Sequence, residues 1–118
     1  MLLDQQATRE AIISNFNQYL TDNDQVREGD TMIFYYAGHG SRVQAPSGWV
    51  SADDQVEVIC PHDMGTIAPN GNIVPGIPDR TVSAMFRRLA DKKGNNIVNT
   101  CARSSTWHLT LCGIDCSN

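Results

Sequence analysis

The sequence predicts an α/β domain, because one apolar strand pattern lies between two helical patterns. The strand pattern covers residues 31–37 and is rich in aromatic side chains. A short apolar run bounded by turn signals is typical of a buried strand in a covered sheet. The helical patterns cover residues 8–20 and 79–92. We expect the strand to be central and both helices to pack on its sheet.

The first predicted helix is amphipathic. Thr8 can cap its start, because its side-chain oxygen can accept a hydrogen bond from a free backbone N–H. The polar residues 21–24 end it. Its apolar residues fall on one helical face: Ile12, Ile13, Phe16 and Leu20.

The second predicted helix has the clearest helical period in the chain. Pro78 and Asp79 give a start signal, and Gly94 gives a stop signal. Basic residues in its later turns complement the helix dipole. Its apolar residues recur at helical spacing: Val82, Met85, Phe86, Leu89 and Ala90.

The segments between these elements are harder to interpret. Residues 41–47 read as a polar loop, and residues 48–50 and 55–60 read as two short extended pieces. A second buried strand begins at residues 97–98. We expect it to fail after two residues, because the following residues are polar and lack clean alternation. Residues 99–118 give no structural prediction.

Composition limits the classes of function. The chain of 118 residues has room for one domain. Its formal net charge of −4 argues against non-specific nucleic-acid binding. No apolar run could span a bilayer, and the N-terminus lacks the pattern of a secretion signal. We therefore expect a cytoplasmic protein with reduced thiols, no membrane partner and no nucleic-acid partner.

A candidate site follows the predicted strand. Gly38 and Gly40 flank His39, so the backbone can turn sharply there and approach a ligand. Open α/β sheets place their sites at the carboxyl ends of strands. On this local pattern alone, a catalytic imidazole and a histidine without chemistry are about equally supported.

Residues 34–40, Phe-Tyr-Tyr-Ala-Gly-His-Gly, closely resemble the His-bearing motif of the caspase-like cysteine peptidases, especially the metacaspase-type and fungal caspase-domain proteins. Residues 59–63 and 94–97 resemble further parts of the same domain. The resemblance covers about residues 2–97. It implies that residues 1–97 form a partial peptidase domain, the large-subunit region, and that residues 98–118 form a divergent tail.

The resemblance implies a three-layer sandwich with a mainly parallel central sheet, helices on both faces, and incomplete ends. It also implies a cysteine-type endopeptidase of peptides or proteins, with a role in programmed cell death. His39 would be the acid–base residue, and the backbone N–H of Gly40 would hold the oxyanion. The alternative is a non-catalytic caspase-like module that binds a partner. An exposed sheet edge could also associate with other chains.

The nucleophile is the part that departs from the family. Relatives carry an apolar strand that ends in an Asp-x-Cys-His-Ser-Gly type motif, and residues 98–104 do not match it. Cys101 and Cys116 are the remaining candidates, and neither has the expected surroundings. The abrupt loss of pattern suggests a frame shift or aberrant splicing. We expect the chain as written to be inactive.

Metal sites are weaker predictions. No cofactor is required, but the resemblance implies a calcium site near Asp53, Asp54 and Asp63. Hard cations need several oxygen ligands, and only these three can be named. A further alternative is a zinc site from residues at i, i+4 and i+8 spacing in the tail with one more cysteine: His108, Cys112, Cys116 and Cys101.

Overall fold

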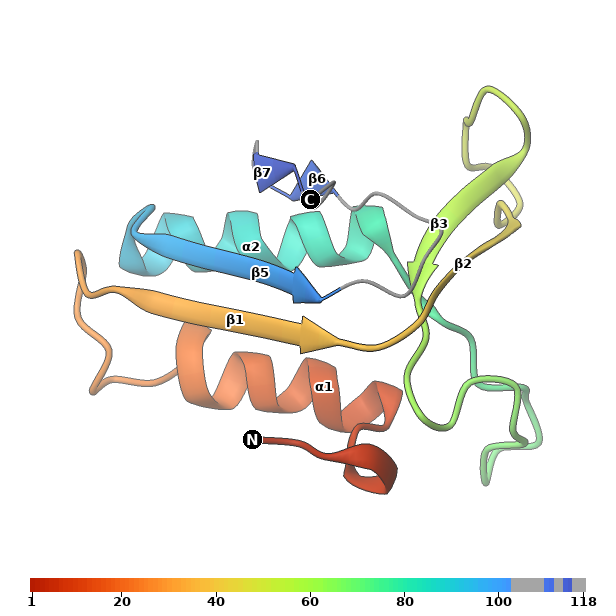
Figure 1. The fold of residues 1–118 in the computed structure, drawn as a ribbon, viewed down its shortest axis with the longest axis horizontal. Coiled ribbons are helices and arrows are strands. Elements are labelled where there is room, and N and C mark those ends of the chain that lie inside the picture. The colour runs from red at the N-terminus through yellow and green to blue at the C-terminus, as the bar shows by residue number, and fades with distance from the viewer. Residues whose placement is uncertain (103–109, 112–113, 116–118) are drawn as a thin grey trace.

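The computed structural model describes residues 1–102, 110–111 and 114–115. The chain combines helices and strands, as expected for an α/β protein: four strands follow the first helical segment, and α2 separates them from the last three (Figure 1). Their bounds, in chain order, are η1 Asp4–Gln6, α1 Arg9–Phe16, η2 Asn17–Thr21, β1 Met32–Ala37, β2 Gly40–Gln44, β3 Gln55–Ile59, β4 Ile77–Pro78, α2 Asp79–Lys93, β5 Ile97–Ala102, β6 Thr110–Leu111 and β7 Ile114–Asp115.

The predicted strand β1 forms a parallel ladder with β5, in a register that runs from Met32 opposite Ile97 to Ala37 opposite Ala102. Figure 1 shows the two strands side by side, pointing the same way. In the described part of the chain β5 is the neighbour of β1 in a two-stranded sheet. The expected parallel pairing is therefore present, whereas the expected central position between two neighbours is not.

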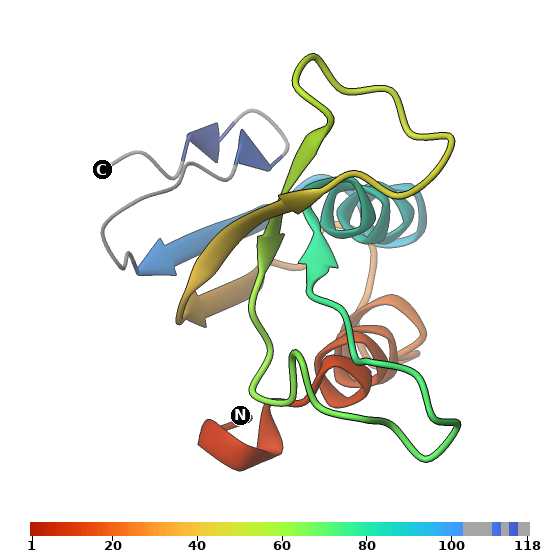
Figure 2. The ribbon, with the colours of Figure 1, turned by 90° about the vertical axis from the view of Figure 1, so that its right-hand side faces the viewer.

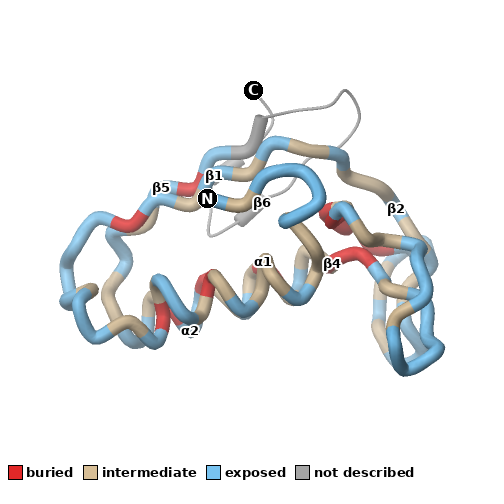
Figure 3. Tube along the Cα trace, turned by 90° about the horizontal axis from the view of Figure 1, so that it is seen from below, coloured by how far each residue is buried: buried red, intermediate tan, exposed pale blue. Residues whose placement is uncertain are grey.

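Both long helices pack on one face of this sheet. Figures 2 and 3 show α1 and α2 on the same side of β1 and β5. Phe34 of β1 makes edge-to-face ring contacts with Phe16 of α1 at 5.7 Å and with Phe86 of α2 at 5.4 Å. Such contacts between aromatic rings stabilise a core beyond their buried area. The helix layer expected on the opposite face is not seen among the described residues.

The opposite face of β1 is open. Burial alternates along the strand, with Met32 at 3% exposed and Ile33 at 68%. Tyr35 also faces outward, and so does Val98 of β5. The continuous apolar run had suggested burial on both faces. The structure instead has a strand that is covered on one face, which is the usual outcome when one helix layer is present.

The two helices agree closely with their sequence patterns. The Thr8 side chain accepts a hydrogen bond from the Ala11 N–H, as expected for a cap. The helical path of α1 continues through Asn17–Thr21 as a π-type turn. The second helix, α2, begins at Asp79 as predicted and buries Val82, Phe86 and Leu89.

Residues 41–44 of the segment predicted as a polar loop belong to a strand, whereas residues 45–47 are not in a strand. Residues of β2 pair antiparallel with β3, from Gly40 opposite Ile59 to Gln44 opposite Gln55. The strand was not predicted because its sequence is polar. Its composition is polar because β2 lies at the edge of its sheet and exposes Arg42 and Gln44. The extended piece expected at residues 48–50 is also wrong, since these residues lie in the turn and loop between β2 and β3.

Strand β5 is longer than predicted. It runs for six residues, Ile97–Ala102, and follows β1 along its whole length. Backbone hydrogen bonds sustain a ladder whatever the side chains are, so polar residues did not stop it. One consequence is that the ladder buries a polar side chain, that of Asn99. It is 6% exposed, and neither its Oδ1 nor its Nδ2 has a hydrogen-bond partner.

Candidate active site

His39 lies between the carboxyl end of β1 and the first residue of β2. The residue is exposed. The chain leaves one sheet at Ala37 and enters the other at Gly40, so His39 sits on the connection between them (Figure 1). This is the position that the Gly-His-Gly pattern predicted.

A backbone N–H and a side-chain hydroxyl both contact the His39 carbonyl. The Cys60 backbone N–H donates a hydrogen bond to this oxygen at 2.9 Å. The Tyr36 hydroxyl lies 3.0 Å from the same oxygen and 3.1 Å from the carbonyl oxygen of Cys60. Its single proton is therefore shared between two acceptors. The His39 carbonyl is held by the backbone of Cys60, which follows β3, and by the phenol of Tyr36 from β1.

Gly38 allows the Tyr36 side chain to fold back over the turn. A Cβ atom at position 38 would lie 2.6 Å from the Tyr36 hydroxyl oxygen and 2.8 Å from its Cζ. Real Cβ atoms do not approach other atoms so closely. The glycine is therefore required by the close contact with Tyr36 rather than by a positive φ.

The Gly40 N–H points away from β3. Gly40 pairs with Ile59, and the adjacent bond runs from the Cys60 N–H to the His39 carbonyl. This pattern makes Gly40 and Ile59 a non-hydrogen-bonded pair, whose own N–H and C=O groups face outward. The β2–β3 ladder therefore leaves this N–H available to another acceptor beside His39.

Strand β5 brings a cysteine to the same sheet edge. Cys101 occupies the register position opposite Tyr36, three residues before His39. The carboxyl ends of parallel strands meet at one edge of a sheet, which is where the two residues lie. Cys116, together with His108 and Cys112 of the zinc alternative, lies outside the described residues.

Comparison with known families decides what kind of domain this is. Residues 2–110 match the family described as metacaspase, peptidase C14 domain. The chain belongs to this family. No curated protein and no solved structure matches the chain closely enough to add to this assignment. The match includes β1, His39 and the whole of β5, and it supports a cysteine peptidase domain by family.

Within this metacaspase domain, sequence reasoning missed the part that Cys60 plays. The sequence predicted only that residues 55–60 form a short extended piece, yet the Cys60 backbone contacts both His39 and Tyr36. Burial raises the pKa of the Cys60 thiol above its ordinary value. A raised pKa keeps the thiol protonated and poorly nucleophilic. Only the pairing of β2 with β3 could have revealed this neighbour of the histidine.

Two of the three carboxylates of the calcium prediction, those of Asp53 and Asp63, have other partners in this metacaspase domain. Asp53 accepts a hydrogen bond from the Gln55 N–H and forms an ion pair with Arg42, and both lower the pKa of its carboxyl. Asp63 accepts a hydrogen bond from the Arg9 N–H. No three acidic, histidine or cysteine side chains are grouped for a metal in the described residues. Calcium dependence stays a prediction.

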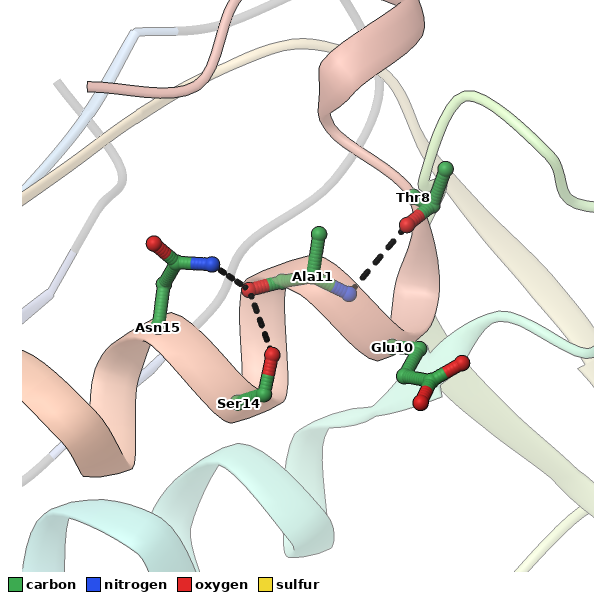
Figure 4. A pocket seen from close by; sticks show the side chains of 5 residues that line it. All are labelled: Thr8, Glu10, Ala11, Ser14 and Asn15. Atoms are coloured by element: carbon green, nitrogen blue, oxygen red, sulfur yellow. Dashed lines mark hydrogen bonds between the residues drawn. The ribbon is translucent and has the colours of Figure 1, made fainter.

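A shallow hollow at the start of α1 offers no second site in the domain. Figure 4 shows that three of its polar side chains, those of Thr8, Ser14 and Asn15, are hydrogen-bonded to the Ala11 backbone. Asn15 donates to the Ala11 carbonyl at 2.8 Å, and Thr8 accepts from the Ala11 N–H. These groups cap and support the helix, so few remain to bind a ligand.

Proposed function

We propose that this chain carries the histidine half of a cysteine-type endopeptidase site. His39 would donate a proton to the leaving amine, and the Gly40 N–H would stabilise the oxyanion. The observation that carries the proposal is the His39–Gly40 connection. It presents an exposed imidazole beside an N–H that points away from its own sheet.

The reaction needs a thiolate as well. The sulfur would attack the scissile carbonyl, a carbon–sulfur bond would form, and the carbon–nitrogen bond would break as the imidazolium protonates the amine. Water would then hydrolyse the thioester. Cys60 is a poor nucleophile because its pKa is raised. Cys101 comes three register positions before His39, and misplacement of about 1 Å can already cost roughly 100-fold.

We therefore infer that the chain as written turns over peptides at no useful rate. Its family supports a peptidase, whereas residues 98–104 lack the motif that supplies the nucleophile. A role in programmed cell death and a cytoplasmic location are proposals from the resemblance and the composition. In the described part of the chain, no helix is long and apolar enough to cross a bilayer.

The test is a panel of fluorogenic peptides cleaved after Asp or after Arg and Lys, with and without calcium. The variants are His39→Ala, Cys101→Ala and Cys116→Ala. His62→Ala and Cys60→Ala serve as matched controls, since neither side chain has a role in the proposed chemistry. No turnover is expected. Turnover that disappears in His39→Ala and in one cysteine variant would contradict the inactivity and identify the nucleophile.

A second experiment tests the histidine half alone. Residues 98–118 are replaced by an apolar strand that ends in Asp-Cys-Cys-His-Ser-Gly. Turnover that appears in this chain and is lost in its His39→Ala form supports the proposal. A folded replacement chain without turnover would show that His39 and Gly40 do not form half of a peptidase site.

One observation favours the alternative, a non-catalytic module. The outer face of the β1–β5 sheet exposes Ile33, Tyr35 and Val98 together, which is typical of a surface that binds another protein. Partner binding that survives His39→Ala and is lost on Tyr35→Lys would favour this alternative.

A further inference from the structure

We propose that Tyr36 is the positioning residue that aims the Gly40 N–H. This inference rests on the proposed function, in which that N–H holds the oxyanion. The Tyr36 hydroxyl acts on the other end of the peptide unit that carries this N–H, because it donates a hydrogen bond to the His39 carbonyl at 3.0 Å.

The geometry of the peptide bond makes this coupling rigid. The His39 carbonyl and the Gly40 N–H belong to one planar trans peptide, so they point in opposite directions. Any rotation of the plane that moves the carbonyl moves the N–H by the same angle. Fixing the carbonyl toward Cys60 and Tyr36 therefore fixes the N–H away from β3.

Two hydrogen-bond donors are needed to fix the orientation of the His39–Gly40 peptide plane, because this peptide lies at the end of a strand. The Cys60 N–H alone gives one bond, at 2.9 Å, at the last rung of the β2–β3 ladder. A single terminal bond lets the peptide rock about it. A carbonyl oxygen has two lone pairs, and the Tyr36 hydroxyl can use the second. The phenol also binds the Cys60 carbonyl at 3.1 Å, which ties both sides of the rung together.

Gly38 contributes to the same arrangement, because it makes room for the Tyr36 side chain. Its missing Cβ leaves room for the phenol, which would otherwise meet that atom at 2.6 Å. The phenol is the end of a flexible side chain, so an alanine at this position would displace it rather than break the strand. Gly38→Ala should therefore remove the hydrogen bond while leaving the hydroxyl in the chain.

The experiment is NMR on the ¹⁵N-labelled chain as it exists, with Tyr36→Phe, Gly38→Ala and the matched control Tyr35→Phe. Tyr35 is 63% exposed on the outer face, so its hydroxyl has no part in the proposal. The residual dipolar coupling of the Gly40 N–H reports the direction of that bond. Hydrogen exchange of the Cys60 N–H reports the strength of the rung.

In Tyr36→Phe we expect a changed Gly40 coupling and about fivefold faster exchange at Cys60, as the loss of one ordinary hydrogen bond implies. Gly38→Ala should reproduce both changes, and the double variant should add little, because the two act on one contact. Tyr35→Phe should change neither. Couplings in the β1–β5 ladder should stay constant in all three, which separates positioning from general loss of stability.

A Gly40 coupling that is unchanged in Tyr36→Phe would overturn the proposal. If that variant does not fold, an unchanged coupling in Gly38→Ala would overturn it equally. Neither measurement depends on turnover, so failure of the peptidase proposal in the replacement chain and failure of this one are separate results.

Discussion

The Asp63 carboxylate accepts a hydrogen bond from the Arg9 backbone N–H at 2.8 Å, across 54 residues of chain. The next bond in the same contact runs from the His62 N–H to the Ala7 carbonyl at 2.8 Å. The start of α1 is thus bound to the segment that follows β3 and Cys60. A helix start leaves N–H groups without partners, and a carboxylate there also complements the helix dipole.

We predict that Asp63→Ala lowers the free energy of unfolding by about 1–2 kcal/mol, which is the usual loss for a cap. Asp63→Asn should lose less, since its amide oxygen can still accept the bond. Urea denaturation measures both. Asp24→Ala, at an exposed turn, is the control and should change little. Equal losses in the alanine variants would argue against capping.

Asn99→Val should stabilise the protein. The buried amide has no partner for either polar atom and lies opposite Phe34 in the β1–β5 ladder. A buried polar group without a partner costs about 1–3 kcal/mol, and an apolar side chain of similar size removes that cost. Thermal and urea unfolding provide the measurement. Thr100→Val, on the exposed face of the same strand, controls for strand propensity alone.

The ion pair of Asp22 should make stability depend on pH. A hydrogen bond from Lys92, at 2.9 Å, is the main cause that lowers the pKa of Asp22 below its ordinary value of 3.8, and Arg88 contributes. A lowered folded-state pKa gives stability that is present above the unfolded-state pKa and is lost as pH falls through the folded-state pKa.

Asp22→Asn should therefore be slightly less stable than the wild type at pH values above the unfolded-state pKa of Asp22 and equally stable below the folded-state pKa, with the difference reduced by salt. Urea midpoints across this range give the comparison. Asp24→Asn, at an exposed turn, is the matched control. A loss that persists below the folded-state pKa would mean that the carboxylate charge is not the cause.

The outer face of the β1–β5 sheet should promote association between copies. Replacing Tyr35 by Thr removes an exposed aromatic ring, and exposed substitutions usually change stability by no more than about 0.5 kcal/mol. We expect Tyr35→Thr to shift sedimentation velocity profiles toward monomer without changing the unfolding midpoint. Phe34→Ala, which alters the covered face, should cost about 3–5 kcal/mol instead. Unchanged self-association in Tyr35→Thr would exclude this face as the contact.

The helices could be predicted because their information is local. Val82, Phe86 and Leu89 recur at helical spacing, and α2 buries all three. The Thr8 cap could be read from the sequence for the same reason. The Gly-His-Gly connection was also found correctly, because glycines mark turns wherever they lie.

The strand pairings and hydrogen bonds that were not predicted join residues far apart in the sequence. Strand β2 is polar and forms only because β3 pairs with it. The hydrogen bond from the Arg9 N–H to the Asp63 carboxylate joins residues that are 54 positions apart. The link between Tyr36 and Cys60 likewise joins two elements that no sequence period connects. Strand β5 was underestimated because side-chain pattern says little about backbone pairing with β1.

The parallel ladder between β1 and β5 also affects how the chain can fold during synthesis. Asn96 and Thr31, at the start of the ladder, are hydrogen-bonded to each other but are 65 residues apart in the chain. A ribosome adds about 5–20 residues per second, so β1 waits roughly 3–13 s for its partner strand to be made. During that interval its aromatic run has neither β5 nor α2 to cover it. A chaperone bound to the nascent β1 segment would cover this aromatic run until α2 and β5 have been made.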